Sequence, residues 1–316
     1  MNMTTTLAGS NFSKVLPEGW DINRIMECVS NSPESVFTPQ SFWNKDFRPV
    51  ICSNLEEFGV YMGHEIAMQI RQTKEEGREL ILILPVGPMG MYKWVVYFLK
   101  QWNVDCKHVY GFNMDEWSDA EGNTLPASDP AAFQNAMINA LYGPLGELTV
   151  PESQRNFATR NNLPLYHEKI KALKARGAKQ VLVFGIGRMC HIAFWEPHLA
   201  KDYATQEDWM HVPHRLGVNL HPFTIEQNAI TSFRSSWPLI PCYANTIGPA
   251  ILFASDYIIG GADGILSRGM QWQGMSLWMT LRYGPDMHIT SSFIPTMPGK
   301  LFFMEELAGP LCADTN

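Results

Sequence analysis

The chain has 316 residues, of which 46% are hydrophobic and 17% charged, and this balance predicts a globular protein with a large apolar core rather than a disordered one. A formal net charge of −7 and the lack of any block rich in Lys and Arg argue against nucleic acid and anionic membrane surfaces as partners. The six cysteines show no CxxC spacing and the N-terminus shows no secretory signal, so we expect reduced thiols, no zinc site and a cytoplasmic location.

Residues 1–48 form a polar, Pro-containing stretch with scattered aromatic side chains, and we expect an N-terminal extension there. This extension could cover a subunit contact or the mouth of an active site. Residues 49–316 are expected to form one α/β domain. The domain begins with a helix that ends near residue 74, because apolar residues recur at helical spacing and Ser53 with Glu56 fits a capping box.

Apolar runs and helical patterns then alternate along the chain. We expect strands at 79–85, 108–112, 179–184, 257–259, 289–293 and 301–303, and helices at 92–102, 131–141 and 162–175. Residues 198–240 show no regular pattern and are expected to be irregular. Strands that alternate with helices predict an α/β fold with a doubly wound, mostly parallel sheet and helices on both faces.

Two segments place chemically active side chains directly after predicted strands. One strand runs into a loop with the adjacent carboxylates Asp115 and Glu116. Another runs into a glycine-rich turn that is followed by His191 and Glu196. Ligands of open α/β sheets bind beyond the carboxyl ends of the strands, so we expect these side chains to meet at one site. His, Glu and Asp together are sufficient for acid–base chemistry.

The same two segments carry recognisable motifs. They read Phe-Asn-Met-Asp-Glu-Trp at 112–117 and Gly-x-Gly-x-x-x-His-Ile-Ala-Phe-x-Glu-Pro at 185–197. Both resemble motifs of the glucosamine-6-phosphate deaminase (isomerase) family, and residues 84–93 resemble that family's phosphate loop. The resemblance extends over residues 50–310. It implies a Rossmann-like α/β sandwich, commonly oligomeric, that converts glucosamine 6-phosphate into fructose 6-phosphate and ammonia without a cofactor.

The resemblance also implies roles for individual residues. His191, held by Glu196, would move a proton onto the ring oxygen when the sugar ring opens. Asp115 would shuttle a proton between C2 and C1 in the aldose–ketose step. Substrate contacts are implied for Gly87, Glu116, Gly185, Gly187 and Arg268. The implied ligand is a sugar or sugar phosphate, bound by a homo-oligomer that needs no metal or other cofactor.

Three positions depart from the family pattern, and all three concern phosphate binding or ring opening. Met189 stands where the family has an Asp two residues before its His. Pro88, which has no backbone N–H to donate, stands where a Ser/Thr pair follows the position of Gly87. Ser267, followed by Arg268, stands where the family has a Lys that pairs with phosphate. We therefore expect a divergent paralogue with an altered substrate, such as a different or unphosphorylated amino sugar.

Other interpretations of these residues remain open. A lactonase-type sugar-phosphate hydrolase shares the family's fold and needs no base at C2. A non-catalytic sugar-binding or regulatory protein would keep the cleft and lack some of the residues that catalysis requires. Met189 and Pro88 favour this interpretation. Cys190 adjoins His191, which invites interpretation as a nucleophile, but a small buried thiol in place of a family glycine is the simpler interpretation.

Overall fold

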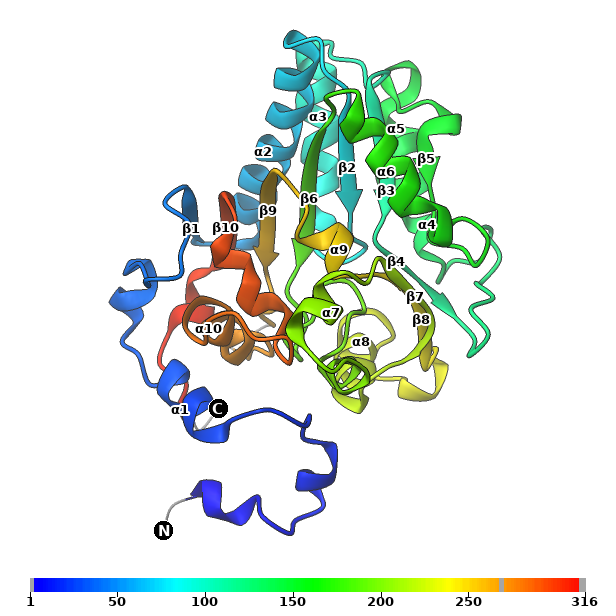
Figure 1. Cartoon of the computed structure of the whole chain (residues 1–316). Coiled ribbons are helices and arrows are strands. Elements are labelled where there is room, and N and C mark those ends of the chain that lie inside the picture. Colours follow the sequence, from blue (N-terminus) through cyan, green and yellow to red (C-terminus); the bar gives the residue numbers. More distant parts are fainter. Residues whose placement is uncertain (1–2, 267–269, 313–316) are drawn as a thin grey trace.

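The computed structural model describes residues 3–266 and 270–312. Its main sheet has seven strands in the order β1-β10-β9-β6-β2-β3-β5, and every neighbouring pair is parallel. A smaller antiparallel sheet of order β4-β8-β7 lies beyond the carboxyl ends of the central strands (Figure 1). The strands are β1 (Phe47–Cys52), β2 (Leu80–Leu84), β3 (Val109–Asn113), β4 (Asp115–Ser118), β5 (Arg155–Asn156), β6 (Lys179–Gly185), β7 (His214–Asn219), β8 (Tyr243–Ile247), β9 (Tyr257–Ala262) and β10 (Gly299–Met304).

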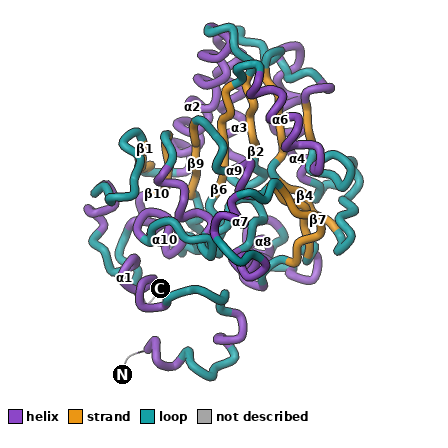
Figure 2. The backbone as a smooth tube through the Cα atoms, viewed as in Figure 1, coloured by secondary structure: helices purple, strands orange, loops and turns teal. Residues whose placement is uncertain are grey.

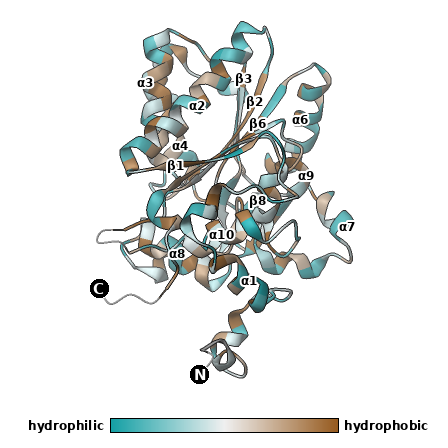
Figure 3. Ribbon diagram, turned by 90° about the vertical axis from the view of Figure 1, so that its left-hand side faces the viewer, coloured by the Kyte–Doolittle hydropathy of each residue, from teal (hydrophilic) through white to brown (hydrophobic). Residues whose placement is uncertain are grey.

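Helices cover both faces of the main sheet. Figure 3 shows α2 and α3 on one side and α6 and α9 on the other, and Figure 2 shows the strands enclosed by helices and loops. Within the described residues the α-helices are α1 (Ile22–Val29), α2 (Leu55–Glu75), α3 (Tyr92–Trp102), α4 (Phe133–Met137), α5 (Gly143–Leu145), α6 (Tyr166–Ala175), α7 (Gln206–Met210), α8 (Pro222–Ser232), α9 (Pro249–Leu252) and α10 (Gly274–Arg282). The predicted α/β fold with a parallel sheet between helical layers is confirmed.

The central strands are buried along their length because helices pack on both faces of the sheet. All five residues of β2 are buried, and so are residues 180–184 of β6. Strands that are buried on both faces form continuous apolar runs, which is why both can be recognised from the sequence. The positions of α2 and α3 also agree with the prediction, because their apolar residues recur at helical spacing.

The start of α2 differs from the prediction by one residue. Asn54, and not Ser53, is the N-cap, because its side chain accepts the backbone N–H of Glu57 at 2.9 Å. Glu57, and not Glu56, reaches back, and its carboxylate accepts the N–H of Ser53 at 2.6 Å. The side-chain cap that the sequence suggested therefore lies one position later in the chain, and Glu57 bonds the residue before the N-cap.

Two further segments differ from the prediction. The sequence predicts a strand at 289–293, but Thr290–Thr296 is a 3-10 helix that packs against α10 and is buried on all sides over residues 290–295. The segment resembles a strand in composition because a position that is buried on all sides selects the same residues. The sequence predicts irregular structure at 198–240, but α7, β7 and α8 lie there. The helical period of α8 is hidden because polar residues line a cavity on one of its faces.

Residues 3–46 form an arm along the lower side of the molecule in Figure 1. α1 packs against α10, and the indole Nε1 of Trp43 donates a hydrogen bond to the carbonyl oxygen of Leu281 at 3.0 Å. β1 begins at Phe47, so the expected end of the extension at residue 48 falls inside a strand of the main sheet. No helix in the described ranges has both the length and the apolar character that a membrane span requires.

Candidate active site

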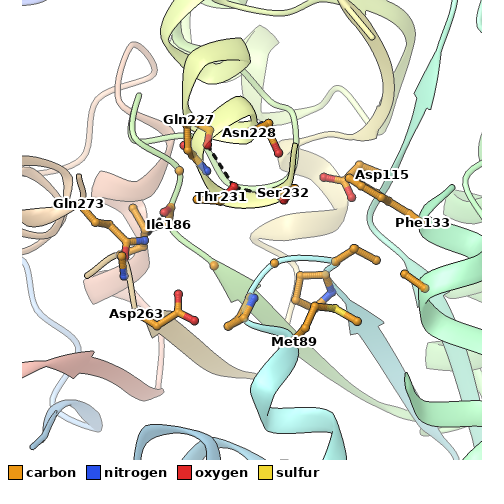
Figure 4. A pocket seen from close by; sticks show the side chains of 18 of the residues that line it. Met89, Asp115, Phe133, Ile186, Gln227, Asn228, Thr231, Ser232, Asp263 and Gln273 are labelled. Carbon is orange, nitrogen blue, oxygen red and sulfur yellow. Dashed lines mark hydrogen bonds between the residues drawn. The ribbon is translucent and has the colours of Figure 1, made fainter. Parts of the chain in front are cut away.

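The ends of four neighbouring parallel strands open into one cavity. The strands are β9, β6, β2 and β3, which are adjacent in this order in the main sheet. The segments directly after them line a cavity of about 770 Å³, and α8 completes its wall (Figure 4). Ligands of open α/β proteins bind beyond the carboxyl ends of the strands, as at this position. The cavity is therefore the candidate active site.

Asp115 reaches the cavity from the first position of β4, where the sequence predicts a loop. Its backbone is fixed by pairing with Thr246 of β8, and only 6% of the residue is exposed. No described residue donates a hydrogen bond to its carboxylate, and burial together with the nearby Glu116 raises the pKa of Asp115 well above its ordinary range. A buried, unpartnered carboxyl group that lines a cavity suits a general base that works near neutral pH.

Glu116 has a different environment from Asp115. Its carboxylate accepts the backbone N–H groups of Trp117 at 3.0 Å, Phe133 at 2.8 Å and Gln134 at 2.8 Å. The last two begin α4, so Glu116 caps that helix from a neighbouring element. Burial raises the pKa of Glu116, and these hydrogen bonds oppose the shift. Glu116 does not line the cavity, and its contacts favour a structural role over the implied substrate contact.

His191 is presented by a tight turn after β6. The N–H of Cys190 donates to the carbonyl oxygen of Gly187, and the N–H of Gly187 donates to that of His191, both at 2.9 Å. Cys190 and Ala193 have φ angles of 57° and 53°, in the left-handed region that non-glycine residues rarely occupy. A Cβ atom on Gly187 would lie 2.0 Å from Nε2 of His191, so only glycine leaves room for the imidazole. The turn is therefore built around the position of the His191 ring.

A buried carboxylate lies behind His191. Nδ1 of His191 is 3.4 Å from Oε2 of Glu196 and 3.3 Å from Oγ1 of Thr224. Burial by itself would raise the pKa of Glu196, but attraction to His191 and hydrogen bonding from His191 and Thr224 outweigh it, so the pKa lies below its ordinary value. An ionised Glu196 favours the tautomer with the proton on Nδ1, which leaves Nε2 to act on a substrate.

The remaining residues of the predicted site differ in their relation to the cavity. Gly87, Gly185 and Gly187 line the cavity, as the resemblance implied for substrate contacts. Met189, which replaces the family's Asp, is buried and does not line the cavity. Arg268 lies outside the described residues.

Sequence reasoning missed several polar residues of the cavity. Asp263 follows β9 as closely as Asp115 follows β3, so the same pattern of strand then carboxylate could have identified it. α8 could not be found in this way, since no regular pattern marks it. The polar side chains added by α8 and the segment before α10 are Gln227, Asn228, Thr231, Ser232 and Gln273 (Figure 4). Within the described ranges, no three His, Cys, Asp or Glu side chains are grouped as a metal site requires.

Comparison with known proteins finds relatives by sequence and by fold. No family model matches the chain. Glucosamine-6-phosphate deaminases from Yersinia pestis and Yersinia pseudotuberculosis are 28% identical to it over 217 residues, which cover 65% of this chain and 73% of theirs. The predicted resemblance therefore extends beyond the two motifs, over 217 residues.

Solved structures share the fold at lower identity. A monomeric glucosamine-6-phosphate deaminase superimposes with a TM-score of 0.64 at 19% identity, covering 82% of this chain and 98% of that one. The 6-phosphogluconolactonase from Trypanosoma brucei superimposes with a TM-score of 0.57 at 14% identity, covering 87% of this chain and 100% of that one. This chain is therefore similar in sequence to glucosamine-6-phosphate deaminases, and it shares the fold of the solved deaminase and 6-phosphogluconolactonase.

Proposed function

We propose that this protein is an amino-sugar isomerase and deaminase, which converts an aldose that carries an amine at C2 into the ketose and ammonia. The observation that carries the proposal is the convergence of Asp115 and His191 on one cavity, with Glu196 buried behind His191. The names of the sequence relatives support the same chemistry. The substrate is an amino sugar or its phosphate.

Ring opening is assigned to His191. Its free Nε2 accepts the proton of the anomeric hydroxyl and returns a proton to the ring oxygen, which breaks the bond from C1 to that oxygen. Glu196 stabilises the imidazolium that exists between these two transfers, since its carboxylate lies 3.4 Å from Nδ1. Thr224 supplies the second contact of Nδ1 and fixes the plane of the ring.

Asp115 is assigned the proton transfer between carbons. It removes the C2 proton of the open aldose while O1 gains a proton from solvent, which gives an enolamine. It then delivers a proton to C1 as the amine nitrogen loses a proton to solvent, which leaves an imine at C2. Water adds to this imine and ammonia leaves, so amino sugar and water give ketose and ammonia. The raised pKa of Asp115 brings its basicity closer to that required for a carbon acid.

Ammonia release by the purified protein tests the proposal. We expect release from an amino sugar by the unaltered protein and its loss in Asp115→Asn. A matched control is Glu147→Gln, an exposed carboxyl group that is not part of the cavity lining. Equal ammonia release by Asp115→Asn and the unaltered protein would refute the assignment of the base.

The lactonase-type hydrolase is the second candidate, because solved 6-phosphogluconolactonases share the fold. Lactone hydrolysis requires no proton transfer at C2. Asp115→Asn should therefore leave lactone hydrolysis largely intact while it abolishes deamination. A protein that binds amino sugars without turnover would instead match the regulatory interpretation.

We also propose a cytoplasmic homo-oligomer with an N-terminal extension over residues 1–48. Reduced thiols support the location, since all six cysteines are unpaired and four are buried. Trp237 and Leu239 are 67% and 68% exposed and offer apolar surface to a second copy. Light scattering of the purified full chain measures its oligomeric state directly.

A further inference from the structure

The cavity has a second carboxylate at the end away from Asp115. Asp263 follows β9 and Asp115 follows β3, and the strands β6 and β2 lie between them. At a spacing of about 4.8 Å between strands, the ends of β9 and β3 are roughly 14 Å apart. Figure 4 shows Asp263 and Asp115 on opposite sides of the cavity. A substrate whose reacting carbons lie at Asp115 therefore presents its other end toward Asp263.

The backbone around Asp263 is anchored, but its carboxylate is not engaged. The N–H of Gly264 donates to Oε1 of Gln273 at 2.7 Å, and the Gln273 amide also donates to the carbonyl oxygen of Ile186. The N–H of Trp272 donates to the carbonyl oxygen of Gly264 at 3.0 Å. None of the described side chains forms a hydrogen bond with the Asp263 carboxylate, and burial raises its pKa to about 6. The group is thus held in place, mostly ionised at neutral pH and available to a ligand.

The loop between β2 and α3 also lines the cavity, and two of its positions offer no N–H to an anion. Pro88 has φ −73° and ψ 67°, and the N–H of Met89 donates to the carbonyl oxygen of Gly87 at 2.7 Å. This is an inverse γ-turn, which uses the N–H of Met89 inside the loop, and Pro88 has no N–H at all. The turn therefore removes two backbone donors from the part of the loop that follows Gly87. Pro88 and Met89 instead present apolar side chains to the cavity.

The charge of the lining agrees with the loop geometry. Asp115 and Asp263 supply two carboxylates to the described lining. Other polar groups of the lining include neutral amides and hydroxyls of α8, such as Asn228 and Ser232, which suit hydroxyl groups of a sugar. A phosphate dianion beside Asp263 would meet like charge in a partly desolvated site.

On the basis of the proposed function, we propose that the natural substrate is an amino sugar without a phosphate group, whose terminal hydroxyl donates a hydrogen bond to the carboxylate of Asp263. Asp263 is thus a specificity-determining residue that selects hydroxyl over phosphate at the far end of the sugar. The turn at Pro88 and the carboxylate at Asp263 both favour this choice, and they arise from different strands.

Binding of glucosamine and glucosamine 6-phosphate to the full chain tests the inference. Trp117 and Trp272 line the cavity, so intrinsic tryptophan fluorescence can report binding without turnover. We expect glucosamine to bind more tightly than its phosphate. Because hydrogen bonds to ionised groups are strong, Asp263→Asn should reduce this preference roughly tenfold or more. Asp263→Lys should reverse the preference, and Glu147→Gln should leave it unchanged.

Tighter binding of glucosamine 6-phosphate, equal binding, or no binding of either sugar by the unaltered protein would overturn the inference. So would an unchanged preference in Asp263→Asn, with Asp263→Ser as the second variant if circular dichroism shows that the first does not fold. Ammonia assays separate the two proposals. Release from glucosamine 6-phosphate with no preference for the free sugar keeps the proposed function and refutes the inference. An Asp263-dependent preference for glucosamine without ammonia release keeps the inference and refutes the proposed function.

Discussion

Single residues explain why the imidazole of His191 has one position. Gly187 leaves the space that the ring occupies, and Glu196 with Thr224 holds Nδ1 from behind. Two non-glycine residues of the same turn, Cys190 and Ala193, accept left-handed backbone angles. Strained backbone of this kind is retained where surrounding contacts fix it, and it commonly occurs at functional sites. The positive φ of Cys190 also agrees with its interpretation as a replacement for glycine.

Gly187→Ala should displace the His191 ring, because the added Cβ would lie 2.0 Å from Nε2. A misplacement of about 1 Å in a catalytic group can lower the rate roughly 100-fold, and we expect a fall of this order in kcat. Steady-state kinetics with the preferred amino sugar measures it. Gly90→Ala is the matched control, since a Cβ there would have no heavy atom within 4 Å. Unchanged kcat in Gly187→Ala would argue against a catalytic His191.

The raised pKa of Asp115 predicts an acid limb in the pH profile. A base must be deprotonated to act, and a raised pKa means that Asp115 gains its proton at a higher pH than an ordinary Asp, whose value is 3.8. The ratio kcat/KM should therefore fall with decreasing pH well before pH 3.8 is approached. Stopped assays across the acid range would show this limb. Full activity down to that value would contradict the assignment.

At the scale of elements, the small antiparallel sheet joins the two halves of the site. β4 carries Asp115 and pairs with β8, where Thr246 lies opposite Asp115. The hydroxyl of Thr246 accepts the N–H of Phe194 at 3.1 Å, which ties β8 to the segment between His191 and Glu196. The buried side chain of Thr246 therefore links β4, which carries the proposed base Asp115, to the loop that follows His191.

Thr246→Val should weaken this connection. The change leaves the buried N–H of Phe194 without its acceptor, which costs about 1–3 kcal/mol of stability, and we expect kcat to fall roughly tenfold. Thr73→Val is the control, because Thr73 is equally buried and its hydroxyl donates within α2 to the carbonyl oxygen of Gln69. Urea unfolding and kinetics of both variants give the comparison. Equal kcat in the two variants would show that the connection has no catalytic role.

The elements also show which parts of the fold the sequence could reveal. The five buried residues of β2 and the helical spacing of α3 are local signals, and both elements lie where they are predicted. The 3-10 helix Thr290–Thr296 resembles a strand in composition because burial on all sides selects the same apolar and small residues. β8 is defined by its pairing with β4, and α8 by its place in the cavity wall. Both depend on contacts with residues far away in the sequence.

The same distinction applies to the candidate site. Asp115 and His191 could be predicted because each follows a strand that has a strong pattern, and both line the cavity. Glu116 shares the motif, yet its carboxylate caps α4, and no local pattern reports a hydrogen bond to residues 133 and 134. Whether a motif residue meets the substrate or the backbone thus depends on tertiary contacts. The catalytic roles themselves stay predictions.

At the scale of the whole molecule, the cavity lowers the stability of the fold at neutral pH. A carboxyl group whose pKa is raised by folding binds its proton more tightly in the folded state, so stability falls as pH rises through the raised range. For Asp263 that range runs from 3.8 to about 6. The other titratable groups of the described lining are Asp115 and His191. Both residues are also present in an Asp263 variant, so the variant differs from the unaltered protein only at Asp263.

Asp263→Asn should therefore raise the free energy of unfolding at pH 7.5 by about 1–3 kcal/mol, and by much less near pH 4, where the native carboxyl group is already protonated. Urea unfolding of the variant and the unaltered protein at the two pH values measures the difference. A variant that is less stable at pH 7.5 would mean that the carboxylate has a stabilising partner in the folded protein.

Deuterium exchange follows the proton transfer between C2 and C1 of an amino sugar that we assign to Asp115. Proton NMR of glucosamine or glucosamine 6-phosphate in D₂O with the protein follows the C2 proton without depending on ammonia release. We expect loss of the C2 proton and deuterium at C1 with the unaltered protein, and neither with Asp115→Asn. Exchange that persists in Asp115→Asn, or that is absent from both sugars with the unaltered protein, would refute the assignment of Asp115 as the base.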